Sequence, residues 1–171
     1  MSVAHISEAL EKVGKLIAEQ PEKAKAKNAP ATARLLEGLR CEVKGPHGET
    51  AYTDMTPAMG GAASAPNPGW LFRAALASCT STAIAMRAAK QGISLTRLEI
   101  TVESSSDSRG LLGLDEKVSA GLSNIICRVK IGADGVAPER LGELAVWGDR
   151  HSPIACTTRN TPELAVEVEV V

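Results

Sequence analysis

The stretch 68–91 is dense in Ala and contains no helix-breaking residue after Gly69. It follows Asn67, which can cap a helix, and it stops at Gly92, a typical residue just past a helix end. The pattern predicts one long helix. Its apolar stripe contains Leu71, Ala75, Cys79, Ala83 and Met86, and Leu76 and Ile84 widen it. We therefore expect this helix to be central and mostly buried.

Alternation of apolar and polar residues predicts strands before and after this helix. Segments 39–44 and 49–54 flank the turn formers Gly45-Pro46-His47-Gly48, which indicates a β-hairpin. Residues 98–102, 125–131 and 164–170 also alternate, and a second helix is expected over 138–148. Successive strands that are joined without a helix pair antiparallel, so the predicted fold class is α+β with mainly antiparallel sheets.

The N-terminal part differs from the rest. Apolar residues at steps of three and four over 6–17 predict an amphipathic helix that Pro21 ends, and the charged, Pro-containing stretch 22–33 resembles a linker. A length of 171 residues suits a single main domain. The expected organisation is therefore a helix and linker over 1–36, acting as a strap across the domain or a subunit, and a main domain over 37–171.

The segment between the strands 98–102 and 125–131 is long for a hairpin loop and carries Leu111, Leu112 and Leu114. Two interpretations remain open. The leucines form a lid or a partner contact, or they fold back onto the core.

Composition excludes several classes of function. Nineteen Lys and Arg balance 20 Asp and Glu to a net charge of -1, and aromatic residues make up only 2%. The sequence therefore predicts no nucleic-acid partner and no base-stacking surface. No segment reaches the roughly 18 apolar residues of a membrane span, and the N-terminal residues lack the apolar run of a secretory signal. We expect a soluble, cytoplasmic protein without a membrane partner.

The four cysteines lie far apart without a C-x-x-C pair, which argues against a zinc site and against a secreted disulfide framework. Phosphate-binding, zinc-protease, serine-hydrolase and dinucleotide motifs are also absent. The sequence thus predicts neither a cofactor nor a metal, and thiols remain as the candidate chemistry. Cys41 and Cys127 fall in predicted strands, where packing is the simpler role.

Cys79 is the candidate nucleophile, although a free Cys in a helix often serves only as a small packing residue. A reactive thiol needs a nearby cation, and the helical neighbours of Cys79 are not basic. Activation would come from another element or another chain, with Arg40, Lys44, His47 and His151 as candidates. His151 also fits a simpler role at a helix C-terminus. Cys156, beside a Pro-containing loop, is the other cysteine with a plausibly exposed setting.

The run N-P-x-x-L-x-x-A-A-L-A-S-C-T at 67–80 resembles the OsmC/Ohr family. The preceding D-M-T-P-A-M-G-G, the following G-I-S-L and the later H-S-P-I resemble that family too, and the match spans about 39–171. The segment 107–115 resembles an OsmC-like subgroup rather than the organic hydroperoxide resistance branch. The N-terminal helix lies outside the usual family core.

The resemblance implies an intertwined homodimer with two long central helices packed under sheets from both chains. It also implies reduction of organic hydroperoxides, with Cys79 as the peroxidatic thiol and a second cysteine, here Cys156, as the candidate resolving thiol. A dithiol protein would be the reductant.

The sequence departs from the peroxidase branch at three positions: Gly69 replaces a Glu, the first hairpin turn has no Arg, and Ser152 replaces the resolving Cys. Two hypotheses follow: a thiol peroxidase, with Cys156 or an external thiol resolving, or a non-catalytic dimer that binds a small apolar ligand or a partner.

Overall fold

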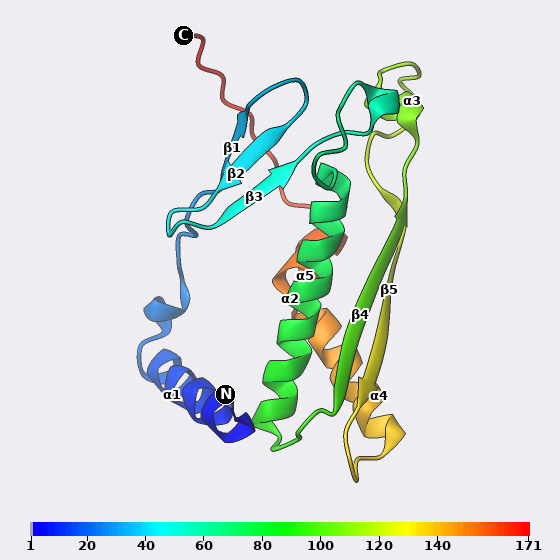
Figure 1. Ribbon diagram of the computed structural model, residues 1–171. Helices are drawn as coiled ribbons and strands as arrows, with labels where there is room; N and C mark the ends of the chain where they lie inside the picture. Colours follow the sequence, from blue (N-terminus) through cyan, green and yellow to red (C-terminus); the bar gives the residue numbers. More distant parts are fainter. Residues whose placement is uncertain (1) are drawn as a thin grey trace.

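The computed structural model describes residues 2–171, and the long helix α2 (Pro68–Lys90) lies at its centre (Figure 1). The Asn67 side chain caps α2 by accepting a hydrogen bond from the Trp70 backbone N–H at 2.8 Å. Gly92 follows the helix with a φ of +70°, a left-handed conformation that glycine adopts without strain. The predicted long helix is confirmed, and its ends follow from local capping.

Two further helices pack on the buried face of α2. These are α4 (Pro138–His151), which extends three residues beyond the predicted end, and α5 (Pro153–Arg159), in a segment that the sequence suggested was a loop. At Gly148 the backbones of α4 and α2 approach so closely that a Cβ atom would overlap the Ile84 side chain. The buried apolar residues of this core are Leu76, Ala83, Ile84, Ala88, Ala89, Leu144 and Ala155.

The strands β4 (Arg97–Ser105) and β5 (Ser123–Gly132) form an antiparallel hairpin along another side of α2 (Figure 1). Along β4, half-buried residues alternate with exposed ones. Opposite charges face each other across the exposed side, with Lys130 Nζ 3.1 Å from Glu99 and Arg128 3.1 Å from Glu103. Both predicted strands and their antiparallel pairing are confirmed.

A three-stranded antiparallel sheet of β1 (Thr32–Leu35), β2 (Cys41–Lys44) and β3 (Thr50–Thr53) precedes α2. The β2–β3 pair is the predicted hairpin. Strand β1 lies within residues 1–36, for which the sequence predicts only a helix and a linker, so it is an additional element. The strand has only four residues and all its side chains are exposed, so neither face is buried, and its pairing with β2 defines it.

The remaining elements are α1 (Val3–Glu19), which packs against α2, the 3-10 turns η1 (Pro21–Ala24) and η2 (Pro57–Met59), and the short helix α3 (Ser108–Leu111). Next to α3, Leu111, Leu112 and Leu114 are 59%, 53% and 71% exposed. The interpretation that these leucines fold back onto the core is therefore wrong within this chain.

The predicted closing strand over 164–170 is also wrong, because residues 161–171 have no regular secondary structure. Leu164, Val166 and Val168 are at least 80% exposed. A strand requires a neighbour that accepts and donates its backbone hydrogen bonds, and this segment has none within the described chain.

The exposed surface of the single chain is unusually large. It measures 12457 Å², whereas a compact monomer of 17.8 kDa exposes about 8,000 Å². Exposed apolar residues in 111–114 and 164–171 contribute to this excess. No helix among residues 2–171 combines the length and hydropathy that a bilayer span requires.

Candidate functional site

Cys79 lies on α2 at the border between a covered and an uncovered helix face. Cys79 is half-buried, and the next residue, Thr80, is fully buried. Ala75, Ser78, Thr82 and Met86 are exposed and recur at steps of three and four, so they line one open face beside Cys79. The Ser78 and Thr82 hydroxyls donate to helix carbonyls at 3.1 and 3.0 Å. Cys79 is therefore reachable from the uncovered side of α2.

The candidate cations of the first sheet have partners of their own. Lys44 Nζ lies 2.9 Å from Glu42, and this contact is the main reason that the pKa of Glu42 is lowered. The Arg40 guanidinium lies over the Tyr52 ring at 4.9 Å. Its Nε atom is buried without a hydrogen-bond partner among residues 2–171.

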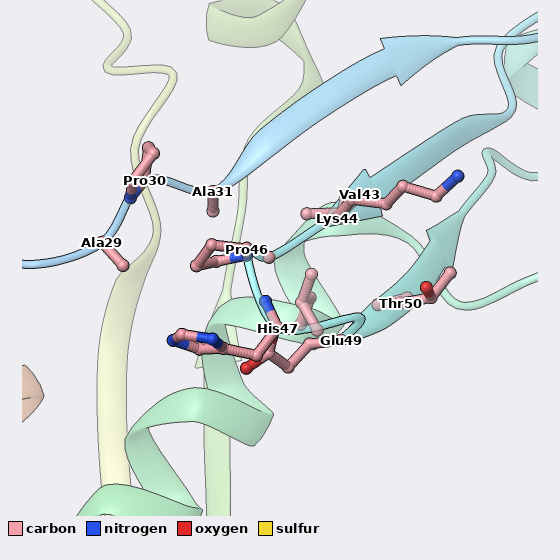
Figure 2. Close-up of a pocket in the computed structure, with 12 residues that line it drawn as sticks. Ala29, Pro30, Ala31, Val43, Lys44, Pro46, His47, Glu49 and Thr50 are labelled. Carbon is pink, nitrogen blue, oxygen red and sulfur yellow. The ribbon is translucent and has the colours of Figure 1, made fainter.

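His47 lies in the exposed β2–β3 turn, where its backbone N–H donates to Glu49 at 2.9 Å. Figure 2 shows this turn next to the linker, and together they border a cavity of about 450 Å³. The cavity reaches α2 at Leu71. Because Leu71 is in the first turns of α2, the hairpin lies near the start of this helix. Leu71 precedes Cys79 by eight residues, about 12 Å along the helix axis.

His151 and Cys156 lie near the junction of α4 and α5. The His151 Nδ1–H donates to the Trp147 carbonyl at 2.7 Å, and the imidazole stacks on the Trp147 ring at 3.9 Å. This contact agrees with the helix C-terminal role that the sequence allowed. Cys156 is exposed on α5, with its Sγ atom 3.5 Å from the Asn160 amide nitrogen.

Ser152 stands where the family resemblance places a resolving cysteine. It is completely buried, and its hydroxyl caps α5 by accepting from the Ala155 backbone N–H at 3.3 Å. Ser152 therefore has a structural role here.

One cluster was not foreseen from the sequence. Arg159 donates to both carboxylate oxygens of Asp149 at 2.6 and 2.7 Å, and this pairing raises the pKa of Arg159. Cys127 borders a small cavity beside this pair, and burial, with a smaller effect of Asp149, raises the pKa of its thiol. A raised thiol pKa disfavours the thiolate, which agrees with a packing role for Cys127. The pair joins residues ten positions apart through space, so no local pattern signals it.

The D-M-T-P-A-M-G-G segment folds around the buried carboxylate of Asp54. This carboxylate accepts hydrogen bonds from the Ser64 backbone N–H at 2.9 Å and the Ser64 hydroxyl at 2.8 Å, and also from the backbone N–H groups of Met55 and Ala62. These bonds, chiefly those from Ser64, lower the pKa of Asp54. Gly61 is required at its position because a Cβ atom there would overlap the Met55 carbonyl. The motif thus fixes the chain path into α2.

The lowered pKa of Asp54 predicts a pH dependence of stability. A carboxyl group with a depressed folded-state pKa stabilises the fold above its ordinary pKa of 3.8, and this contribution is lost as the pH falls through the folded-state value. We expect Asp54→Asn to lower the free energy of unfolding at pH 7 and to lower it less near pH 3. Urea unfolding at both pH values measures this. A difference that stays constant with pH, or an equal effect of Asp134→Asn at an exposed position, would contradict the prediction.

Comparison with known proteins places the chain in a family. The family model described as OsmC-like protein matches residues 61–167, more than half of the chain. The chain belongs to the OsmC-like family. The matched part contains Cys79, His151 and Cys156, whereas Arg40 lies before it. No curated protein matches the sequence significantly.

Solved structures agree with this OsmC-like fold. An organic hydroperoxide resistance protein OsmC from Legionella pneumophila is 25% identical, with a TM-score of 0.62 over 79% of this chain and 92% of that chain. An OsmC-like protein from Mycoplasma pneumoniae is 18% identical, with a TM-score of 0.68 over 80% and 91%. The organic hydroperoxide resistance protein OhrB of Bacillus subtilis is 22% identical, with a TM-score of 0.53 over 79% and 93%. The predicted family and α+β fold are confirmed.

Proposed function

We propose that this OsmC-like protein reduces organic hydroperoxides with Cys79 as the peroxidatic thiol. The observation that carries the proposal is the half-buried Cys79 at the edge of the open face of α2, inside the segment that the family model matches. Such a position holds the thiol on a rigid element and leaves it accessible. The names of the Legionella and Bacillus proteins, which refer to organic hydroperoxide resistance, support the same class of substrate.

The chemistry requires one thiolate and one peroxide. The Cys79 thiolate attacks the terminal peroxide oxygen, the O–O bond breaks, and the alkoxide leaves as an alcohol after it takes up a proton. Cysteine is oxidised to sulfenic acid while the hydroperoxide is reduced. The cytoplasm is the fitting compartment, because thiols are kept reduced there.

We propose that an external thiol completes the cycle. Ser152 is buried as a helix cap and carries no thiol, and Cys156 lies one helical turn further on and is exposed. A low-molecular-weight thiol therefore condenses with the Cys79 sulfenic acid and releases water, and a second thiol then reduces the mixed disulfide. A dithiol reductant would supply both thiols from one molecule.

We propose that the working form is an intertwined homodimer. The chain exposes 12457 Å² of surface, about 4,500 Å² more than a compact monomer of its size. The open face of α2, Leu112, Leu114 and the segment 164–171 all lie within this excess. A second copy would cover them and could bring a cation to Cys79.

Sedimentation equilibrium tests this assembly. We expect a species of twice the chain mass of 17.8 kDa at micromolar concentration. A monomer that is stable under those conditions would contradict the homodimer.

Mass spectrometry tests the chemistry directly. The reduced protein is exposed briefly to a near-stoichiometric organic hydroperoxide together with a sulfenic-acid trap. We expect rapid formation of an adduct at Cys79 and none in Cys79→Ser. If Cys79 stays reduced for minutes in excess hydroperoxide, the assignment is wrong.

One observation favours a second candidate, a non-catalytic ligand-binding dimer. Within the chain, Lys44 is paired with Glu42 and Arg159 with Asp149, so these cations are already engaged. A persistently reduced Cys79 would favour this candidate.

A further inference from the structure

A large cavity lies at the start of α2, away from the position of Cys79. It is bordered by the first turns of α2, the end of β4, α3 and the loop that leads into β5, and its volume is about 650 Å³. This volume falls in the range of small-molecule sites. On α2 the lining extends to Arg73, six residues before Cys79 and about 9 Å from it along the helix axis.

Arg73 is the cation of this cavity. Its Nη1 donates to the Ser104 hydroxyl at 3.3 Å, and no carboxylate of residues 2–171 lies within ion-pair distance of it. A neutral hydroxyl leaves the charge of the guanidinium uncompensated. Gly69 leaves room beside it, since a Cβ atom at Gly69 would lie 3.6 Å from Arg73 Nη1.

The two acidic residues that border the cavity are already paired. Glu103 accepts from Arg128 at 3.1 Å, and Asp107 accepts from Arg109 at 2.6 Å. Hydrogen bonds from Arg109 lower the pKa of Asp107 to about 2. Each pair is close to neutral, so Arg73 leaves the cavity with a net positive charge.

The rest of the wall includes hydrocarbon from several elements. Met55, Val102, Leu111 and Leu122 border the cavity, and Leu111 is 59% exposed. A bound apolar chain would cover part of this surface and remove it from water.

From this arrangement we propose that the cavity binds an amphipathic monocarboxylate, with its carboxylate on Arg73 and its hydrocarbon chain along the apolar wall. The planar guanidinium matches a carboxylate with two parallel N–H···O bonds. One guanidinium neutralises one charge, which favours a monoanion. This binding uses no atom of Cys79, so it stands apart from the proposed reduction of hydroperoxides.

The test compares octanoate with 1-octanol, which has the same chain length and no charge, by titration calorimetry on the reduced, full-length protein. We expect octanoate to bind at least about tenfold more tightly than 1-octanol, the effect of a charge-assisted pair. Arg73→Gln should remove this preference and leave 1-octanol binding unchanged. Arg140→Gln, which removes a cation paired with Glu143 on α4, is the matched control and should change neither affinity.

A second pair of variants does not depend on losing Arg73. Gly69→Glu would place a carboxylate beside Arg73 and compete with the ligand, whereas Gly69→Gln adds similar bulk without the charge. We expect octanoate binding to be weakened about tenfold or more in Gly69→Glu relative to Gly69→Gln. Thermal unfolding of each variant establishes that it is folded.

Equal affinity for octanoate and 1-octanol in the native protein, or unchanged octanoate binding in folded Arg73→Gln, would overturn the proposal. The titration is repeated with Cys79→Ser, where octanoate binding should persist. Octanoate binding by a native protein that does not reduce hydroperoxides would count against the proposed function alone, and octanoate binding that is lost in folded Cys79→Ser would count against a separate cavity site.

Discussion

Replacement of Cys79 by Ser is expected to lower hydroperoxide turnover by at least about a thousandfold, because a hydroxyl at this position cannot form the sulfenic acid. Turnover is measured as the loss of an organic hydroperoxide in the presence of a low-molecular-weight thiol. The thiol is in excess, so that regeneration of Cys79 does not limit the rate.

The other cysteines provide matched controls. We expect Cys156→Ser to retain turnover within about twofold if an external thiol resolves the sulfenic acid. Cys127→Ser tests a thiol whose pKa is raised, mainly by burial, and it should also remain active. Turnover that survives in Cys79→Ser would refute the peroxidatic role, and turnover that is lost in Cys156→Ser would instead identify Cys156 as the resolving thiol.

Gly148→Ala is expected to have the largest effect on stability. The added Cβ would overlap the Ile84 Cγ1 atom and lie 2.8 Å from the Ile84 backbone nitrogen. Ile84 is completely buried, so neither its side chain nor the α2 backbone can move aside freely. Overpacking of this kind costs about 1–3 kcal/mol, which corresponds to a decrease in Tm of several degrees, about 2–4 °C for each kcal/mol.

Gly142→Ala is the control for this prediction. It lies in the same helix, α4, and a Cβ atom there meets nothing within 4 Å. Replacing an exposed helical Gly by Ala removes a propensity cost, so stability should rise by up to about 1 kcal/mol. Thermal unfolding followed by circular dichroism compares the two variants. Equal shifts in Tm would show that the close contact between α4 and α2 does not limit the fold.

Local patterns in the sequence predict the elements whose signals are themselves local. Asn67, Gly92 and the breaker-free run between them determine α2, because capping and helix propensity act within a few residues. Alternation over β4 and β5 predicts two strands because one face of each strand is partly buried. The family resemblance rests on residues of the same helix and the segments around it.

The same local signals fail where pairing decides the structure. Strand β1 has only four residues, exposes every side chain and is defined by its hydrogen bonds to β2, so burial of one face does not identify it. Residues 164–170 alternate strongly and yet form no strand, because they pair with no other segment of the described chain. A strand is a property of two segments, and its sequence describes only one of them.

The sequence by itself determined the central helix, the antiparallel hairpins and the family that points to Cys79. The tertiary structure alone decided which charges are paired and which remain free. Asp149 and Arg159 meet through space, whereas Arg73 reaches a neutral hydroxyl in a cavity that Gly69 leaves open. Helix and strand signals repeat over a few residues, but ion pairs and cavities depend on distances between elements that no local pattern encodes.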